Sequence, residues 1–341
     1  MKRTIAVILL FLLLLSACSK PESAKVIGTS ATERTTVTEA GIVSETREET
    51  AMPGTDAPEE AWTDPEDYVP PTSDNPMAIC NLFPDPYFAR TVAWALDREA
   101  ADVVSYEELA SYRGEIHCSP GPLKSIEGIG LLKNITAFDS AKNDLAVIPA
   151  EFGKLTELKS INLLKSYSLK KLPEEIGNLK KLTFLRVDMT NLEALPAGIG
   201  GCESLQILNA ANTPIQSVPA EIGRLKNLLF LDLHSTGIQK IPDSICQLTK
   251  LQSLDLGDTK LKALPQNIGR LSALLRLDLF GCQLKTLPSG LKNLKQLRYL
   301  NVFDNFSLNE DYMQWFDEKI WGCKDDPAEE ERWSSFYHYN G

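Results

Sequence analysis

Few side chains in this 341-residue chain have the types and spacing that catalysis requires. The three histidines are His117, His234 and His338, and His234 follows Asp232 by two positions. A carboxylate beside an imidazole can perform acid–base chemistry, so a hydrolytic pair is conceivable at Asp232 and His234. However, the sequence has no HExxH, P-loop, GxSxG or glycine-rich dinucleotide motif to accompany it. We therefore expect a protein without catalytic activity and without a cofactor.

The seven cysteines form no recognisable metal-binding motif. Structural zinc sites commonly use two cysteines separated by two residues, and this CxxC spacing does not occur in the chain. We therefore expect no metal site.

A repeat of 23 residues organises most of the chain. An apolar residue followed by proline recurs once after 24 residues and then every 23, at Pro149, Pro173, Pro196, Pro219, Pro242, Pro265 and Pro288. Between the prolines runs the pattern LxxLxxLxLxxxxLxxLPxxIGxL. The LxL core is typical of a short strand, and PxxIGxL is typical of a short helical or 3-10 segment. A single unit cannot bury its leucines, so stacked units must share one core beside a parallel sheet.

This pattern resembles the leucine-rich-repeat family over residues 123–308. The resemblance implies an α/β fold, a right-handed solenoid of about eight turns with a parallel concave β-sheet and a convex side of short helical or 3-10 segments. The family usually has a column of asparagines that satisfies backbone groups inside the turns. Here that column is mostly threonine, whose hydroxyl can donate and accept. Its members are Asn143, Ser166, Thr190, Thr213, Thr236, Thr259, Cys282 and Asn305.

The positions that the repeat leaves free alternate outward from the predicted strands onto the concave face. Aromatic side chains there have no core to fill, and aromatic anchors among polar groups are typical of a binding interface. We predict a site for a protein or peptide partner with basic and apolar features. Its residues are Phe184, Arg186, Asp188, Ile207, Asn209, Phe230, Asp232, His234, Asp255, Asp258, Arg276, Asp278, Phe280, Tyr299, Asn301 and Phe303. Two alternatives stay open: the aspartates and asparagines serve only the strand surface, or the ligand is a glycan.

Residues 77–122 are predicted to form a helical N-terminal cap. FPDxxFxxxV at 83–92, VSYEEL at 104–109 and SIEGIGLL at 125–132 resemble the caps of internalin-type bacterial surface proteins. Apolar residues at helical spacing predict a helix over 84–95, and Ser105 with Glu108 predicts the start of another. Cys80 and Cys118 flank the cap, and we predict a disulfide between them because export permits one. Cys202 and Cys282 stand at repeat positions, where we expect small buried residues.

The N-terminus indicates export. Two basic residues precede an apolar run over 5–15, which is too short to span a bilayer and is typical of a secretory signal. Leu15-Ser16-Ala17-Cys18 resembles the bacterial lipobox, which implies a signal peptide at 1–17 and a lipid on Cys18, against the alternative of a plain signal peptide. Residues 18–76 are rich in Thr, Glu and Pro and predict a disordered acidic tether. The expected location is the cell envelope, lipid-anchored and surface-exposed.

The acidity of the chain lies outside the repeats. Of the formal net charge of −11, most comes from the tether and from the C-terminal stretch, so the repeats are near neutral and we expect no nucleic-acid partner. Residues 309–341 are dense in aromatics and predict a C-terminal cap and tail. We therefore expect a monomeric, surface-anchored recognition module. The alternatives are an envelope scaffold lipoprotein and a glycan-binding adhesin.

Overall fold

The computed structural model describes residues 76–309. The predicted signal peptide with Cys18, the acidic tether except its last residue, and the predicted C-terminal cap except its first residue lie outside this range. Within it, none of the helices combines the length and the apolar character that crossing a membrane requires.

Three short helices precede the repeats, and the sequence predicts the second and the third of them. They are α2 (Ile79–Leu82), α3 (Pro86–Ala95) and α4 (Tyr106–Ser111), and β1 (Met77–Ala78) pairs antiparallel with β2 (Val103–Val104). Helix α3 begins where Asp85 Oδ1 accepts hydrogen bonds from the Tyr87 and Phe88 amides. Helix α4 begins where the Ser105 hydroxyl accepts a hydrogen bond from the Glu108 amide, which confirms Ser105 as the N-cap residue of this helix. The other carboxylate oxygen of Asp85 accepts the Lys124 and Ser125 amides and so ties α3 to the first repeat.

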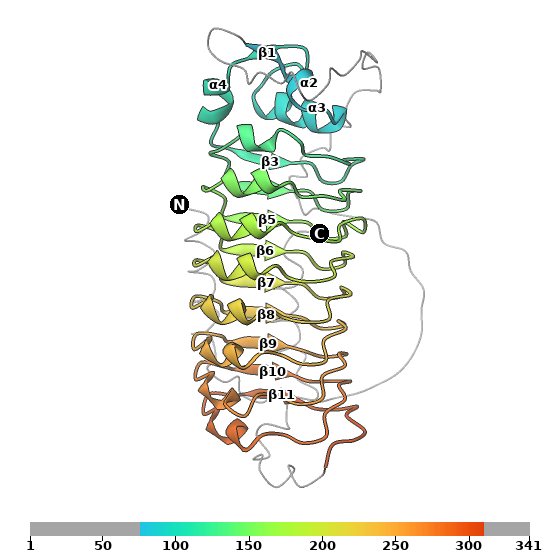
Figure 1. Ribbon diagram of the computed structural model, residues 1–341, viewed down its shortest axis with the longest axis vertical. Coiled ribbons are helices and arrows are strands. Elements are labelled where there is room, and N and C mark those ends of the chain that lie inside the picture. The colour runs from blue at the N-terminus through green and yellow to red at the C-terminus, as the bar shows by residue number, and fades with distance from the viewer. Residues whose placement is uncertain (1–75, 310–341) are drawn as a thin grey trace, which may run out of the picture. The chain divides into compact units, whose positions relative to one another are not determined.

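Nine strands form one parallel sheet in chain order (Figure 1). Neighbouring strands pair in register, so equivalent positions of successive turns stand side by side. The first strand, Glu115–His117, belongs to the segment predicted as a cap, so the sheet begins before the first recognisable repeat. The strands are β3 (Glu115–His117), β4 (Ala137–Asp139), β5 (Ser160–Asn162), β6 (Phe184–Arg186), β7 (Ile207–Asn209), β8 (Phe230–Asp232), β9 (Ser253–Asp255), β10 (Arg276–Asp278) and β11 (Tyr299–Asn301).

The PxxIGxL segments form 3-10 helices. In most of them the proline is the N-cap residue in extended conformation, one position earlier than the first helical residue. The following glycine allows successive helices to approach closely, because a Cβ at Gly223 would lie 2.5 Å from the Ser244 carbonyl oxygen. The helices are η2 (Ile129–Leu131), η3 (Ala150–Lys154), η4 (Glu174–Asn178), η5 (Ala197–Gly201), η6 (Ala220–Arg224), η7 (Asp243–Gln247), η8 (Ile268–Arg270) and η9 (Ser289–Asn293).

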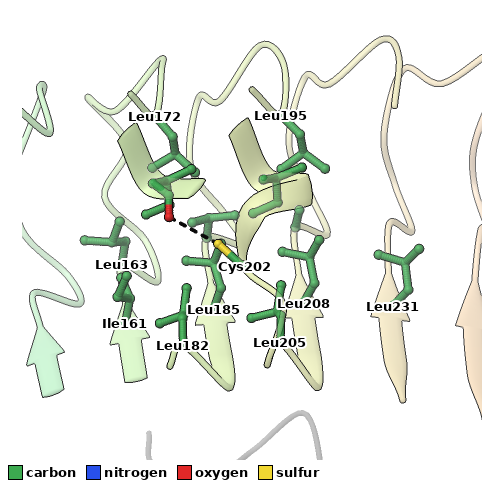
Figure 2. Packing of buried hydrophobic residues seen from close by; sticks show 14 of the residues in the cluster. Ile161, Leu163, Leu172, Leu182, Leu185, Leu195, Cys202, Leu205, Leu208 and Leu231 are labelled. Carbon is green, nitrogen blue, oxygen red and sulfur yellow. Dashed lines mark hydrogen bonds between the residues drawn. The ribbon is translucent and has the colours of Figure 1, made fainter. Parts of the chain in front are cut away.

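Leucines fill the space between the sheet and the 3-10 helices. Figure 2 shows one section of this core, where Leu185, Leu208 and Leu231 project from consecutive strands. Each fully buried leucine contributes roughly 1.5–3 kcal/mol of hydrophobic free energy. Cys202 takes a leucine position, is fully buried and donates its thiol hydrogen to the Ile176 carbonyl at 3.2 Å. The predicted burial of Cys202 and Cys282 is confirmed.

The threonine column satisfies backbone groups, but mainly within single turns. Thr190, Thr213, Thr236 and Thr259 each donate to the carbonyl three residues earlier, at 2.7–2.8 Å. The asparagines at the two ends of the column also reach the preceding turn: Asn305 donates to the Leu279 carbonyl and accepts the Leu284 amide. Ser166 and Cys282 also reach the preceding turn, where they donate to the Ser140 and Leu256 carbonyls at 3.2 and 3.1 Å. The four threonines therefore satisfy their own turns, while the other members of the column join successive turns.

Each turn leaves the sheet through one residue in left-handed conformation, with φ between 51° and 61° from Lys142 to Asp304. The amide of this residue donates to a carbonyl of the next turn, as Ser235 does to Gly257 at 2.8 Å. These bonds fix the backbone just beyond each strand, which includes the position of His234.

Candidate functional site

The side chains that flank the buried centre of each strand lie on the side of the sheet away from the leucines, which we call the sheet face. In β8, Leu231 is buried in the core while Phe230 and Asp232 lie on the sheet face. Strand register places the predicted site residues there in rows, and His234 continues the pattern one step beyond β8. Asp258 departs from it, because it is an exposed residue of the left-handed turn after β9. We call the last residue of each strand the middle row: His117, Asp139, Asn162, Arg186, Asn209, Asp232, Asp255, Asp278 and Asn301.

The Asp and Asn side chains of the middle row share one structural task. In each, Oδ1 accepts a hydrogen bond from the amide two residues later, at 3.0–3.2 Å. This contact shapes the backbone as the chain leaves the strand. Asn162, Asn209 and Asn301 make this contact as well as the aspartates do, so the contact depends on the oxygen and not on the charge. The turn after Arg186 has the same left-handed residue, Met189, without such an oxygen.

Three consecutive aspartates therefore carry negative charge that the backbone does not use. Asp232, Asp255 and Asp278 come from adjacent strands and are all buried, since short side chains lie between rows of larger ones. Arg276 pairs with Asp278 at 2.7 Å and lies 4.0 Å from Asp255. Among the residues that the structure describes, Asp232 Oδ2 is buried without a hydrogen-bond partner.

His234 and Asp232 form the carboxylate–imidazole pair that the sequence suggests. His234 Nδ1 lies 3.0 Å from Asp232 Oδ1, and Nε2 lies 3.1 Å from the side-chain nitrogen of Asn212. The hydrogen bond to Asp232, with the further charges of Asp255 and Asp258, raises the pKa of His234 to about 9. The imidazole is thus held protonated near neutral pH, which is unsuited to a general base.

The charge of the Asp255 carboxyl is poorly compensated. Burial, followed by the charges of Asp232 and Asp278, raises its pKa to about 7. Its hydrogen bond from the Gly257 amide and the charge of Arg276 oppose this shift without cancelling it. A ligand that brings positive charge to this position would relieve an electrostatic cost already present in the fold.

Two arginine pairs flank Asp232 and Asp255, which we call the acidic centre. Arg186 Nε donates to Asp188 Oδ1 at 2.8 Å, and burial is the main cause of the raised pKa of Asp188. On the other side, Arg276 stacks over the Tyr299 ring at 4.1 Å, and the Tyr299 hydroxyl donates to Asp278 Oδ2 at 3.3 Å. These pairs hold the side chains around the acidic centre in defined positions.

The apolar side chains of the sheet face are less exposed than the sequence predicts. Phe280 is exposed, whereas the remaining members of the predicted apolar set are half-buried. Strands in a sheet stand about 4.8 Å apart, so neighbouring side chains cover much of each other. These half-buried residues are Phe184, Ile207, Phe230, Tyr299 and Phe303.

The structure brings together ligand types that the expectation of no metal site overlooked. Three potential ligand atoms, one each from Asp232, His234 and Asp255, lie within 4.8 Å of one another. The three residues span two turns of the solenoid, so no contiguous motif in the sequence encodes the group. The 23-residue spacing of Asp232 and Asp255 is the signal that could have revealed it.

The predicted disulfide between Cys80 and Cys118 is not formed, and both residues are free thiols. Cys80 is exposed on α2, whereas Cys118 is fully buried at the end of β3. Burial raises the pKa of the Cys118 thiol to about 12. The positions of the two cysteines at the ends of the cap did not indicate that one side chain is exposed and the other is buried.

A hollow that the sequence did not reveal lies beside β3. It has a volume of about 250 Å³ and is lined by Thr91, Trp94, Ala95, Tyr112, Glu115 and His117. Trp94 is largely exposed there. The helical spacing of α3 places Trp94 away from its buried side, but spacing alone does not predict a hollow.

Comparison with known proteins shows the fold. No protein-family model matches the chain, and no curated protein matches it. Among solved structures, internalin C2 of Listeria monocytogenes superimposes with a TM-score of 0.58 at 23% identity, over 66% of this chain and 96% of that one. The protein is a leucine-rich-repeat solenoid. This solenoid is also similar to the plant peptide hormone receptor RGFR1 in complex with RGF2, with a TM-score of 0.50 and 28% identity. The match spans 56% of this chain and 30% of the receptor.

Proposed function

We propose that the sheet face is a non-catalytic recognition surface for a protein or peptide partner with basic and apolar groups. The observation that carries this proposal is the pair of buried aspartates among half-buried aromatics, in which Asp232 Oδ2 has no hydrogen-bond partner among the described residues and burial raises the pKa of Asp255 to about 7. The backbone contact of this row uses only an oxygen that asparagine also offers. A similar solenoid is described as a peptide hormone receptor in a complex, which supports a peptide-sized ligand. Aromatic anchors beside desolvated charges are typical of interface hot spots.

A selection from a random-peptide library against the immobilised full chain tests this surface. We expect enrichment of peptides that combine Lys or Arg with aromatic or aliphatic residues, and binding that weakens as salt rises. A Phe230→Ala, Tyr299→Ala double variant should lose the enriched peptides. Phe306→Ala is the matched control, because Phe306 is 94% exposed and lies beyond β11.

The outcomes separate the candidate surfaces. Peptides retained equally by the double variant would place the site outside the sheet face and overturn the proposal. Loss on Phe306→Ala alone would do the same. Enrichment on a glycan array without any peptide enrichment would favour the glycan-binding alternative, and no ligand of either class would favour the scaffold.

We further propose that the protein is exported and displayed as a monomer at the bacterial surface, with a lipid on Cys18 and residues 18–76 as a tether. The lipobox-like sequence and the similarity to an internalin support this location. Labelling cells with a fatty-acid analogue should modify the parent and not Cys18→Ser. Protease added to intact cells should then remove the solenoid, and full protection from protease would contradict surface display.

A further inference from the structure

We propose that Asp232, His234 and Asp255 bind a divalent transition-metal ion on the sheet face. The group joins two adjacent turns, since Asp232 and His234 belong to the β8 turn and Asp255 ends β9. Their ligand atoms lie within 4.8 Å of one another. This inference does not rest on the identity of any partner, and it goes beyond the proposed recognition role.

The buried carboxylates point to a cation because the fold does not need their charge. Asp232 and Asp255 each use Oδ1 to accept a backbone amide, which Asn209 does equally well in the neighbouring turn. Asp232 is only 4% exposed, and its Oδ2 has no hydrogen-bond partner within residues 76–309. A buried carboxylate oxygen without a partner is costly, and a metal ion would satisfy it.

A metal ion suits this position better than a cationic side chain of a partner. Asp232 and Asp255 are 4% and 9% exposed, so the guanidinium or ammonium group of a partner would meet them only at their exposed edge on the sheet face. A small ion needs only the gap between the ligand atoms. Imidazole together with carboxylates is a ligand set that zinc and similar ions accept, and three protein ligands leave a coordination position open.

The geometry requires one modest adjustment. Ligand atoms at zinc distances of about 2.0–2.2 Å in tetrahedral arrangement lie about 3.4 Å from one another. The ligand atoms of the group lie within 4.8 Å of one another, so the widest separation must close by up to about 1.4 Å. With Nδ1 as ligand, Nε2 faces Asn212, whose amide can turn its oxygen to accept the ring N–H and orient the imidazole.

Protons compete with the ion at this site. Binding requires a neutral imidazole and ionised carboxylates, so a zinc ion would displace the proton of His234. The charged groups facing His234 are Asp232, Asp255 and Asp258, and those facing Asp255 include Asp278 and Arg276.

Isothermal titration of the metal-free full chain with zinc chloride tests the proposal, with Cys80→Ser as background because Cys80 is an exposed thiol that can bind zinc. We expect His234→Gln and Asp255→Asn each to weaken one zinc site at least tenfold. Asp255→Asn keeps the side-chain oxygen that accepts the Gly257 amide, so thermal unfolding should show that it folds.

Two variants serve as matched controls. His117→Gln removes the exposed histidine paired with Glu115, and Asp139→Asn changes a middle-row aspartate with the same backbone contact. Both should bind zinc like the background protein. Equal affinity of His234→Gln and the background protein, loss of the site in His117→Gln, or no zinc binding at all would each overturn the proposal.

Discussion

Two carboxylate–histidine pairs occupy the same sheet, and they differ in almost everything except their spacing. Glu115 and His117 lie in β3, and Asp232 and His234 lie at the end of β8; in each pair the nitrogen is 3.0 Å from the oxygen. The β3 side chains are 59% and 51% exposed, whereas those of Asp232 and His234 are 6% and 36% exposed. Water screens the first pair, and exposed pairs contribute little to stability. Equal spacing and equal distance therefore do not make equal sites.

The neighbouring strands cause this difference. His117 ends the first strand of the sheet and stands beside Asp139 alone, whereas Asp232 stands between Asn209 and Asp255. Side chains on both sides of Asp232 exclude water, so the charges around it interact more strongly. An ion pair in the middle of the solenoid is therefore poorly solvated, and its charges interact more strongly with their neighbours than those of an exposed pair.

The largest expected effect concerns the core beneath the two pairs. Leu231 and Ile116 are both fully buried, or nearly so, at the centres of β8 and β3. Replacing either by Ala should lower the free energy of unfolding by about 2–5 kcal/mol, measured by chemical denaturation. If Ile116→Ala cost much less than Leu231→Ala, the contrast between the two pairs would come from a weaker core beneath β3. It would then not come from the neighbouring side chains on the sheet face.

The next effect separates the backbone contact of the Asp232 carboxyl from its charge. Asp232→Ala removes the acceptor of the His234 amide, and Asp232→Asn keeps it. We expect the alanine variant to be less stable than the asparagine variant by about 1–3 kcal/mol. Glu115→Ala and Glu115→Gln should differ by less than about 0.5 kcal/mol, because Glu115 is on the surface. An equal stability difference between the two variants at Asp232 and the two variants at Glu115 would contradict the comparison.

A smaller effect should appear in the pH dependence of stability. The folded-state pKa of His234 is raised to about 9 from 6.5, so the stabilisation it provides is complete below pH 6.5 and is lost as pH rises through 9. Between these limits the parent should lose stability relative to His234→Gln. The thermal unfolding temperatures of the two proteins across this pH range check the prediction. If both temperatures changed in parallel with pH, Asp232 would not hold the proton on His234.

The sequence predicted most of the architecture, since a fixed period constrains each repeat position many times over. The strands, the 3-10 segments, the leucine core and the rows of the sheet face all follow from it. It did not predict that β3 joins the sheet, because Glu115-Ile116-His117 lacks the leucine pattern. Cys80 and Cys118 were paired by position along the chain, although only one of them is buried.

The sequence predicts which residues line the sheet face, but it does not predict how deeply each of them is buried. The middle row was identified, yet the burial of Asp232 and Asp255 depends on side chains from adjacent turns, which the pattern leaves variable. The same limit explains the expectation of no metal site. Ligands 23 residues apart become neighbours only when the register of the strands is known.

The central claim is that the sheet face keeps its aspartates for binding and not for folding. The most direct test is the free energy of unfolding of Asp255→Asn against the parent, by denaturant titration at pH 8 with EDTA present. The variant should be more stable, by on the order of 1 kcal/mol, because it keeps the bond from the Gly257 amide and removes a buried charge whose pKa is raised to about 7. A less stable variant would show that the carboxylate supports the fold, and it would contradict the account.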